Sequence, residues 1–92
     1  MIELSIIIPV YNEKNTILEI INRVEKTNIN KQIIIVDDFS IDGTREILIK
    51  NKQKIKLILH DKNMGKGAAI RSAQQYVEGN YVIIQDADLE YN

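Results

Sequence analysis

The chain has 92 residues, of which 45% are hydrophobic and 27% are charged, so it can form one small folded domain but not two. Twelve basic and thirteen acidic residues give a formal net charge of -1, which argues against binding nucleic acid through a general basic field. The absence of cysteine and the single histidine, His60, exclude disulfides, thiol catalysis, cysteine-ligated metals and multi-histidine metal sites.

The N-terminal segment MIELSIIIPV does not have the features of a targeting sequence. It lacks the basic residues and the cleavage site of a signal peptide. The apolar runs along the chain are only a few residues long, far below the length that spans a bilayer. We therefore expect a cytoplasmic protein.

Four short apolar runs recur along the chain, and each is too short for a helix. None of them alternates apolar with polar residues, which is typical of parallel strands that are covered on both faces. We therefore predict four strands, at Leu4–Val10, Gln32–Asp37, Ile55–Leu59 and Tyr81–Gln85.

The first two segments between these strands have helical spacing. An apolar stripe predicts a helix after the first strand, with Asn15 as its N-cap. The stripe is formed by Ile17, Ile20, Ile21 and Val24. A short helix is predicted over residues 43–50, with Ser40 or Asp42 as its cap.

A third helix is predicted between the third and fourth strands, with Gly79 as its C-cap. Its apolar positions are Ala69, Ile70, Ala73, Tyr76 and Val77. Strands and helices therefore alternate along the chain. This order predicts an α/β fold, a four-stranded parallel sheet with right-handed crossovers and helices on both faces.

Every aspartate in the sequence lies at the end of a predicted strand or just after it. They are Asp37, Asp38, Asp42, Asp61, Asp86 and Asp88. The carboxyl ends of parallel strands lie along one edge of a sheet, and open α/β sheets bind their ligands at that edge. Carboxylates gathered in this way repel each other unless a cation lies among them, so we expect a divalent metal there.

The segment QDADLE follows the last predicted strand and carries the candidate metal ligands. Asp86 and Asp88, together with phosphate oxygens and water, suit Mg²⁺ or Mn²⁺. Glu90 could supply a third carboxylate. The alternative is a solvated acidic turn that closes a strand, because aspartate is common in turns.

Two other strand ends carry candidate nucleotide-binding residues. In the segment IPVYNE, Pro9 ends the strand, Tyr11 offers a flat face on which a base could stack, and Glu13 offers a polar edge. In the segment VDDFSIDGT, Asp38 could accept a hydrogen bond from a nucleobase N–H or a ribose hydroxyl. The alternative at both positions is an ordinary strand end followed by a turn.

The segment NMGKGAAIR opens the third helix with two glycines and a lysine. Free backbone N–H groups and the helix dipole can hold phosphate at such a position, and Lys66 and Arg71 add positive charge. The alternative is a flexible loop with exposed basic residues. His60 follows the third strand and is expected to be a rim histidine, not a catalyst, because no nucleophile–base–acid arrangement can be built around it.

Together these segments resemble the N-terminal half of a family 2 glycosyltransferase with the GT-A fold. The matching pieces are SIIIPVYNE, IIIVDDFSIDGT, NMGKGAAIRSA and QDADLEY, which cover nearly the whole chain in the order and spacing of the family. The resemblance is strongest to the dolichyl- or polyprenyl-phosphate mannose and glucose synthase branch. It implies a Rossmann-like, nucleotide-binding half of a GT-A domain.

The resemblance also implies roles for individual residues. Asp37 would support the nucleotide pocket from behind. The pocket would be lined by Pro9, Tyr11, Glu13, Asp38, Asp61, Lys66, Arg71 and Asp86. The metal that bridges the diphosphate would be ligated by Asp86, Asp88 and Glu90, the last at a position that is often glutamine in this branch.

The implied reaction is the metal-dependent transfer of a hexose from a nucleoside-diphosphate sugar, such as GDP-mannose or UDP-glucose, with inversion. The acceptor would be a polyprenyl phosphate or a glycan, reached at the cytoplasmic face of the membrane. Nucleic acid is not an expected partner.

Catalytic domains of this family run to more than twice this length, so we expect residues 1–92 to be the incomplete, nucleotide-sugar-binding part of one. The general base would then lie beyond Asn92. The last strand would be an uncovered edge that favours self-association. The alternative is a remnant that binds a nucleotide or a partner without turnover.

Overall fold

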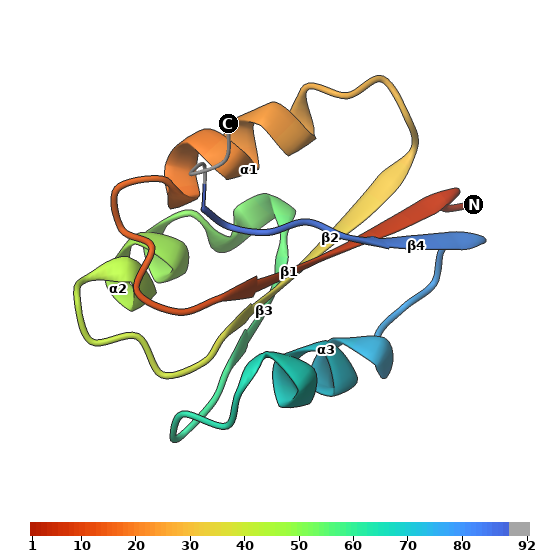
Figure 1. The fold of residues 1–92 in the computed structure, drawn as a ribbon. Helices are drawn as coiled ribbons and strands as arrows, with labels where there is room; N and C mark the ends of the chain where they lie inside the picture. The colour runs from red at the N-terminus through yellow and green to blue at the C-terminus, as the bar shows by residue number, and fades with distance from the viewer. Residues whose placement is uncertain (89–92) are drawn as a thin grey trace.

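The structure, a computed structural model, describes residues 1–88. Its elements, in chain order, are β1 (Leu4–Val10), α1 (Ile17–Glu25), β2 (Lys31–Asp37), α2 (Thr44–Lys50), the 3-10 helix η1 (Lys52–Lys54), β3 (Lys56–Leu59), α3 (Lys66–Gln74) and β4 (Tyr81–Ile84). Figure 1 shows the strands running through the middle of the molecule, with α1 above them and α3 below. Each strand begins and ends within one residue of its predicted position.

The strands form one sheet in the order β3-β2-β1-β4, and every neighbouring pair is parallel. β1 and β2 pair along their whole length, from Leu4 opposite Lys31 to Val10 opposite Asp37. β4 pairs only with the first part of β1, as far as Ile7. The prediction of a four-stranded parallel sheet is confirmed.

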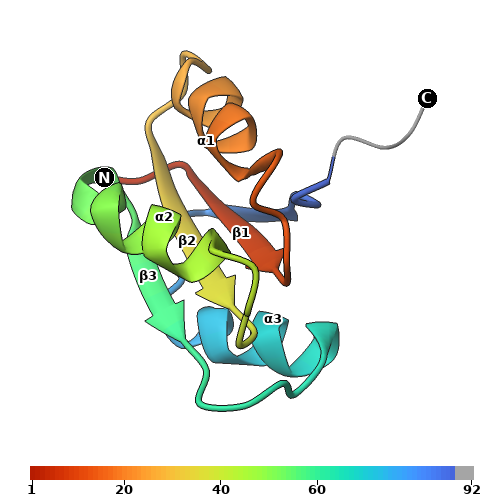
Figure 2. The same ribbon diagram turned by 90° about the vertical axis from the view of Figure 1, so that its left-hand side faces the viewer.

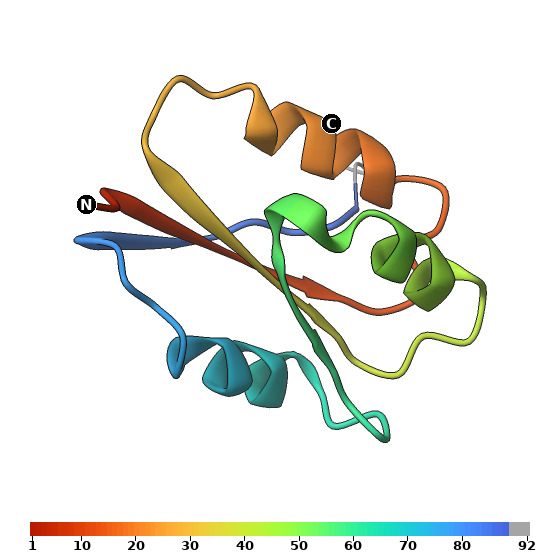
Figure 3. The ribbon, with the colours of Figure 1, turned by 180° about the vertical axis from the view of Figure 1, so that it is seen from behind.

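Helices cover both faces of the sheet, as Figures 2 and 3 show from two sides. Successive residues of β1 and β2 point to opposite faces, and both faces are apolar, which explains the continuous apolar runs in the sequence. On the side of α1 and α2 the buried core includes Ile6, Ile8, Ile33, Ile35, Ile17, Ile20, Ile21 and Leu48. On the side of α3 it consists of Ile7, Ile34, Val36, Ala69 and Ala73. None of the helices in residues 1–88 is long and apolar enough to cross a membrane.

The start of α1 differs from the prediction by one residue. Thr16, not Asn15, occupies the N-cap position, and its side chain makes no capping bond. Its hydroxyl instead donates to the carbonyl oxygen of Ala87 at 2.7 Å, which fastens the segment after β4 to the start of α1.

α2 begins after Gly43, whose φ of +106° lies in the left-handed region that favours glycine. Neither Ser40 nor Asp42 occupies the N-cap position that we predicted for one of them. Ser40 instead accepts the backbone N–H of Asn12 at 2.8 Å. Asp42 lies one residue before the N-cap, and its Oδ1 accepts the N–H of Thr44 at 3.0 Å, so it still satisfies a donor of the first turn.

α3 ends well before Gly79, so the prediction that Gly79 caps this helix is wrong, and Tyr76 and Val77 lie beyond the helix. A side chain of β2 explains the early end. Gln32 Nε2 donates to the carbonyl of Tyr76 at 2.7 Å, and Gln32 Oε1 accepts the N–H of Glu78 at 3.0 Å. These bonds hold the connection between α3 and β4 in a non-helical course.

Gly79 is required for a different reason, the close approach of this connection to β1. Its N–H donates to Ser5 Oγ at 2.9 Å. A Cβ at this position would lie 2.7 Å from the backbone nitrogen of Ser5 and 2.8 Å from the carbonyl carbon of Leu4. No side chain fits there without a backbone shift.

Pro9 does not end β1 as we predicted, because the strand continues to Val10. The carbonyl of Ile7 accepts the N–H of Gln85, so the backbone groups of Ile7 and, two residues on, Pro9 face the side of β4. β4 itself ends opposite Ile7. The missing N–H of Pro9 therefore interrupts no strand pairing, which is why a proline fits inside this strand.

β4 is covered on neither face by the described residues, although its apolar run is typical of a doubly covered strand. The exposed fractions of its residues are 65% for Tyr81, 47% for Val82, 46% for Ile83 and 47% for Ile84. On the side of α1, β4 borders an apolar cavity of about 400 Å³ whose lining includes Ile6, Ile20, Val24 and Ile83. β4 is thus an apolar edge strand of the described sheet.

Candidate functional site

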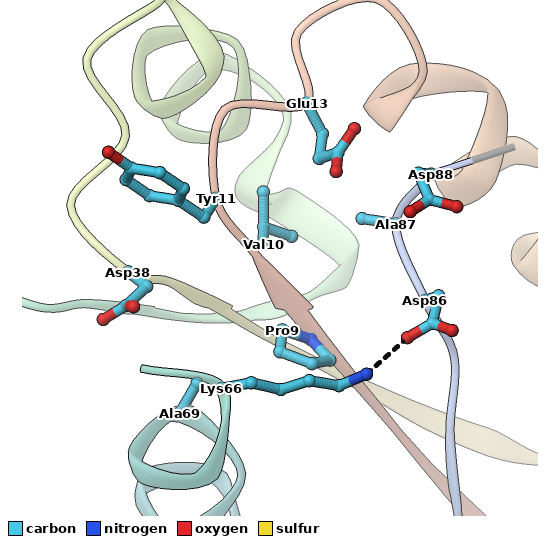
Figure 4. Close-up of a pocket in the computed structure, with 10 residues that line it drawn as sticks. All are labelled: Pro9, Val10, Tyr11, Glu13, Asp38, Lys66, Ala69, Asp86, Ala87 and Asp88. Carbon is cyan, nitrogen blue, oxygen red and sulfur yellow. Dashed lines mark hydrogen bonds and ion pairs between the residues drawn. The ribbon is translucent and has the colours of Figure 1, made fainter. Parts of the chain in front are cut away.

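The carboxyl ends of β1, β2 and β4 and the start of α3 enclose a cavity of about 190 Å³ (Figure 4). It is lined by Pro9, Val10, Tyr11, Glu13, Asp38, Lys66, Ala69, Asp86, Ala87 and Asp88. Most of the residues singled out from the sequence are among them. The parallel sheet brings these residues together, because it places the ends of strands that are far apart in the sequence along one edge.

The loop after β1 is fastened to the loop after β2. Asn12 adopts a φ of +55°, and its Oδ1 accepts the backbone N–H of Ile41 at 2.9 Å. The N–H of Glu13 donates to Thr44 Oγ1 at 2.9 Å. These bonds fix the backbone that carries Tyr11 and Glu13 on the cavity wall. Tyr11 is 45% exposed, which leaves it accessible to a stacking partner.

Asp38 is buried at the end of β2, and both of its carboxylate oxygens accept hydrogen bonds. Oδ1 accepts the N–H of Met64 at 2.8 Å and lies 2.9 Å from Nδ1 of His60, while Oδ2 accepts the N–H of Gly65 at 2.8 Å. Burial alone raises the pKa of this carboxyl, but the bonds from His60, Met64 and Gly65 outweigh burial and hold the pKa below its ordinary value. Asp38 is therefore ionised at neutral pH.

The bonds to Asp38 change one expectation about the start of α3. The glycine-rich segment was expected to offer its N–H groups to a phosphate. Those of Met64 and Gly65 are instead occupied by the Asp38 carboxylate. The first bond within the helix runs from the N–H of Ala69 to the carbonyl of Gly65, so the donors that precede it belong to Lys66, Gly67 and Ala68.

His60 is the residue that sequence reasoning placed least well. It is 7% exposed and lies between β2 and α3 instead of at an open rim. Its Nε2 lies 2.8 Å from Ser72 Oγ, and its backbone N–H donates to the carbonyl of Asp37 at 3.0 Å. Its position directly after β3 could have indicated this, because the end of β3 lies beside the end of β2 in a parallel sheet.

Asp37 is fully buried behind the cavity wall and does not line the cavity. Its Oδ2 accepts hydrogen bonds from Arg45 Nε at 2.9 Å and from the N–H of Ser40 at 3.0 Å. Arg45 also donates from Nη2 to the carbonyl of His60 at 2.6 Å. Arg45, which the sequence analysis did not single out, thus ties the ends of β2 and β3 together.

Asp86 and Asp88 bring two carboxylates to the cavity (Figure 4). Asp86 Oδ1 accepts a hydrogen bond from Lys66 Nζ at 2.8 Å, and both side chains are largely exposed. Within residues 1–88, no three His, Cys, Asp or Glu side chains are grouped so as to hold a metal ion. The donor type fits a hard divalent cation, because carboxylate oxygens are its preferred ligands, although Lys66 occupies one oxygen of Asp86 in this structure.

Three predicted site residues do not appear on the cavity wall. Asp61 is exposed on the loop after β3. Arg71 is exposed on α3, with its guanidinium beside the position that a Cβ of Gly67 would take. Glu90 lies outside the described residues. The roles expected for Asp61 at the edge of the base, for Arg71 at the phosphates and for Glu90 at the metal stay predictions.

Known proteins match this chain along nearly its whole length. The model of the family "Glycosyl transferase family 2" matches residues 5–92. The undecaprenyl-phosphate 4-deoxy-4-formamido-L-arabinose transferase of Salmonella choleraesuis is 35% identical over 96 residues, which cover 96% of this chain and 29% of the transferase. The chain therefore spans less than a third of the length of this relative.

Two solved structures show the same fold at this level of coverage. S. aureus TarS 1-349 in complex with UDP has a TM-score of 0.85 and 31% identity, and the match covers 95% of this chain and 28% of the TarS 1-349 chain. The mannosyltransferase PcManGT from Pyrobaculum calidifontis in complex with GDP-Man and Mn²⁺ has a TM-score of 0.86 and 26% identity, over 94% of this chain and 27% of that protein. With the family model matched over residues 5–92, the sheet order and the site at its carboxyl edge agree with one conclusion: the chain belongs to glycosyl transferase family 2.

Proposed function

We propose that residues 1–92 are the nucleotide-sugar-binding part of a glycosyltransferase that moves a hexose from GDP-mannose or UDP-glucose to a polyprenyl phosphate, with inversion. The observation that carries this proposal is the cavity at the carboxyl edge of the sheet, which gathers Tyr11, Asp38, Lys66, Asp86 and Asp88. The Salmonella relative is named for transfer to undecaprenyl phosphate, and the two solved relatives hold UDP or GDP-Man.

The two ends of the cavity suit different parts of the donor. Tyr11 and Pro9 supply flat, partly apolar surface for the base, and the ionised Asp38 keeps an acceptor beside it. Asp86 and Asp88 would hold Mg²⁺ or Mn²⁺, which supplies positive charge to the departing diphosphate. Lys66, already paired with Asp86, carries a second positive charge to the same side. A polyprenyl phosphate is itself an anion, so it needs little help from a general base.

Calorimetric titration of GDP and UDP, each with and without Mn²⁺, tests the proposal. We expect one nucleotide to bind in a Mn²⁺-dependent manner, and Asp88→Asn to weaken this binding by about tenfold or more, because it removes a charged metal ligand. Glu46→Gln is the matched control, since it removes an exposed carboxylate of α2 that is not on the cavity wall.

Failure of both nucleotides to bind would contradict the proposal, provided that circular dichroism shows a folded chain. Binding that is equally strong in Asp88→Asn would contradict the metal site alone. Nucleotide binding without any sugar transfer to added polyprenyl phosphate would favour the alternative, a chain that binds nucleotide without turnover.

A further inference from the structure

Three side chains from separate parts of the chain form a hydrogen-bonded series beside the cavity. Asp38 follows β2, His60 follows β3, and Ser72 belongs to α3. Asp38 Oδ1 lies 2.9 Å from His60 Nδ1, and His60 Nε2 lies 2.8 Å from Ser72 Oγ. Of the three, only Asp38 lines the cavity, so His60 and Ser72 are not in direct contact with a ligand bound there.

The direction of these bonds follows from the charge of Asp38. An ionised carboxylate only accepts hydrogen bonds, so His60 must donate to it from Nδ1. In the uncharged ring, Nε2 is then an acceptor and takes the hydroxyl hydrogen of Ser72. Ser72 thereby gives Nε2 a partner in the one uncharged form of the ring that can donate to Asp38.

The Asp38 carboxylate in turn determines where α3 begins. It accepts the N–H groups of Met64 and Gly65, the two residues directly before the helix. Gly65 has a φ of +96°, which allows the chain to turn from this anchor into the helix. Lys66 is the first residue of α3, and its ammonium lies 2.8 Å from Asp86.

We propose that His60 is a positioning residue for the nucleoside diphosphate: its Nδ1–H holds the Asp38 carboxylate in the orientation that anchors Met64 and Gly65, and so places Lys66 beside Asp86. This inference rests on the proposed function of the cavity. The expectation that no nucleophile–base–acid arrangement can be built around His60 is wrong, because Asp38, His60 and Ser72 have the acid–histidine–serine order of a hydrolase. Ser72 does not line the cavity, however, and is not a nucleophile for a ligand bound there.

The single histidine makes the first test unambiguous. A long-range ¹H–¹⁵N spectrum at neutral pH reports which ring nitrogens of His60 carry hydrogen. We expect hydrogen on Nδ1, with or without hydrogen on Nε2. A ring with hydrogen on Nε2 alone would overturn the proposal, whatever the outcome of nucleotide titrations.

Two substitutions separate positioning from packing. The side-chain amide of His60→Asn can lie near the place of Nδ1, whereas that of His60→Gln reaches the place of Nε2. We expect His60→Asn to keep the Mn²⁺-dependent affinity for GDP or UDP within about threefold, and His60→Gln to lose about tenfold, the upper end of one hydrogen bond. The amide-proton shifts of Met64 and Gly65 should change strongly in His60→Gln and little in His60→Asn.

Equal amide shifts in the two variants would overturn the positioning role even if the wild type bound no nucleotide. If the wild-type chain binds neither nucleotide but the amide shifts of Met64 and Gly65 change in His60→Gln and not in His60→Asn, the anchoring of α3 is supported. Only the proposed function is then rejected. If both variants fail to fold, Ser72→Ala replaces them. It removes only the bond to Nε2, so we expect hydrogen to stay on Nδ1, because the ionised Asp38 still requires that donor. Hydrogen on Nε2 alone in Ser72→Ala would overturn the proposal that Nδ1–H holds Asp38.

Discussion

Two adjacent aspartates at the end of β2 have different environments because successive strand residues point to opposite sides. Asp37 turns away from the cavity and pairs with Arg45, whereas Asp38 lies on the cavity wall and pairs with His60. The sequence predicted two carboxylates at a strand end. It did not predict their partners: Arg45 reaches Asp37 only after α2 has packed against the sheet, and the one signal for His60, its position directly after β3, was not used.

The lowered pKa of Asp38 predicts how stability depends on pH. Because its pKa in the folded chain lies below the ordinary value of 3.8, the unfolded chain binds this proton more readily. The carboxylate therefore stabilises the fold fully above about pH 4, and its contribution is lost as the pH falls through the folded pKa. Urea unfolding between about pH 6 and about pH 2 should show a shallower loss of stability in Asp38→Asn than in the wild type. Parallel curves would contradict the lowered pKa.

Gly79 and Gly67 provide a matched pair of substitutions. A Cβ at Gly79 would lie 2.7 Å from the backbone of Ser5, so Gly79→Ala should lower the free energy of unfolding by about 1–3 kcal/mol. A Cβ at Gly67 meets only the flexible end of Arg71 at 3.4 Å, and Gly67 lies within α3, so Gly67→Ala should raise it by up to about 1 kcal/mol. Urea unfolding followed by circular dichroism measures both changes, and equal effects would contradict the close approach at Gly79.

At the scale of elements, strands were easier to predict than helix ends. β1 occupies the range predicted from its apolar run, Leu4–Val10, with Pro9 inside it and not at its end, because an apolar run buried on both faces is visible in the sequence alone. The end of α3 was not predicted correctly, because it depends on Gln32 in β2, whose side chain makes hydrogen bonds to Tyr76 and Glu78. Such ends depend on tertiary contacts that no local pattern records.

Gln32 is therefore expected to stabilise the connection from α3 to β4. Gln32→Ala removes its bonds to Ser5, Tyr76 and Glu78, which should lower the free energy of unfolding by about 1–3 kcal/mol. The amide hydrogen of Gly79 should also exchange faster with solvent. Gln53→Ala, on exposed η1, serves as the control and should change neither quantity. A stable Gln32→Ala chain with unchanged exchange would show that packing alone holds the connection.

For the whole molecule, alternation of strands and helices was sufficient to predict the sheet, its direction and the edge at which a site forms. The prediction that the aspartates gather at that edge to form a ligand site was only partly right. Asp38, Asp86 and Asp88 reach the cavity, whereas Asp37, Asp42 and Asp61 do not line it. Asp42 accepts hydrogen bonds at the start of α2, and these outweigh burial and lower its pKa. Helix starts and ligand sites use the same residue type at the same edge, so composition cannot separate them.

The exposed apolar edge strand β4 predicts self-association of the 92-residue chain. Sedimentation should show a mass that rises with concentration, because β4 offers unpaired backbone groups and apolar side chains together. Val82→Lys should suppress this association without loss of stability, since Val82 is 47% exposed. Leu18→Lys, on α1 and 45% exposed, is the control and should leave the association unchanged. Equal suppression by both would assign the effect to net charge instead of β4.

Pro9 contributes to the shape of the cavity through its backbone, because it lies where the pairing of β1 with β4 ends. The pairing of β1 with β4 ends at Ile7, and Pro9, which faces the side of β4, has no N–H with which to extend it. Beyond Ile7 the two chain segments are no longer paired, and Pro9 and Asp86 lie on the wall of the cavity between them. The missing N–H of Pro9 is fixed by covalent structure and does not depend on a ligand. The separation of the two strands at the cavity is therefore expected without a ligand, so a ligand would not have to separate them in order to bind.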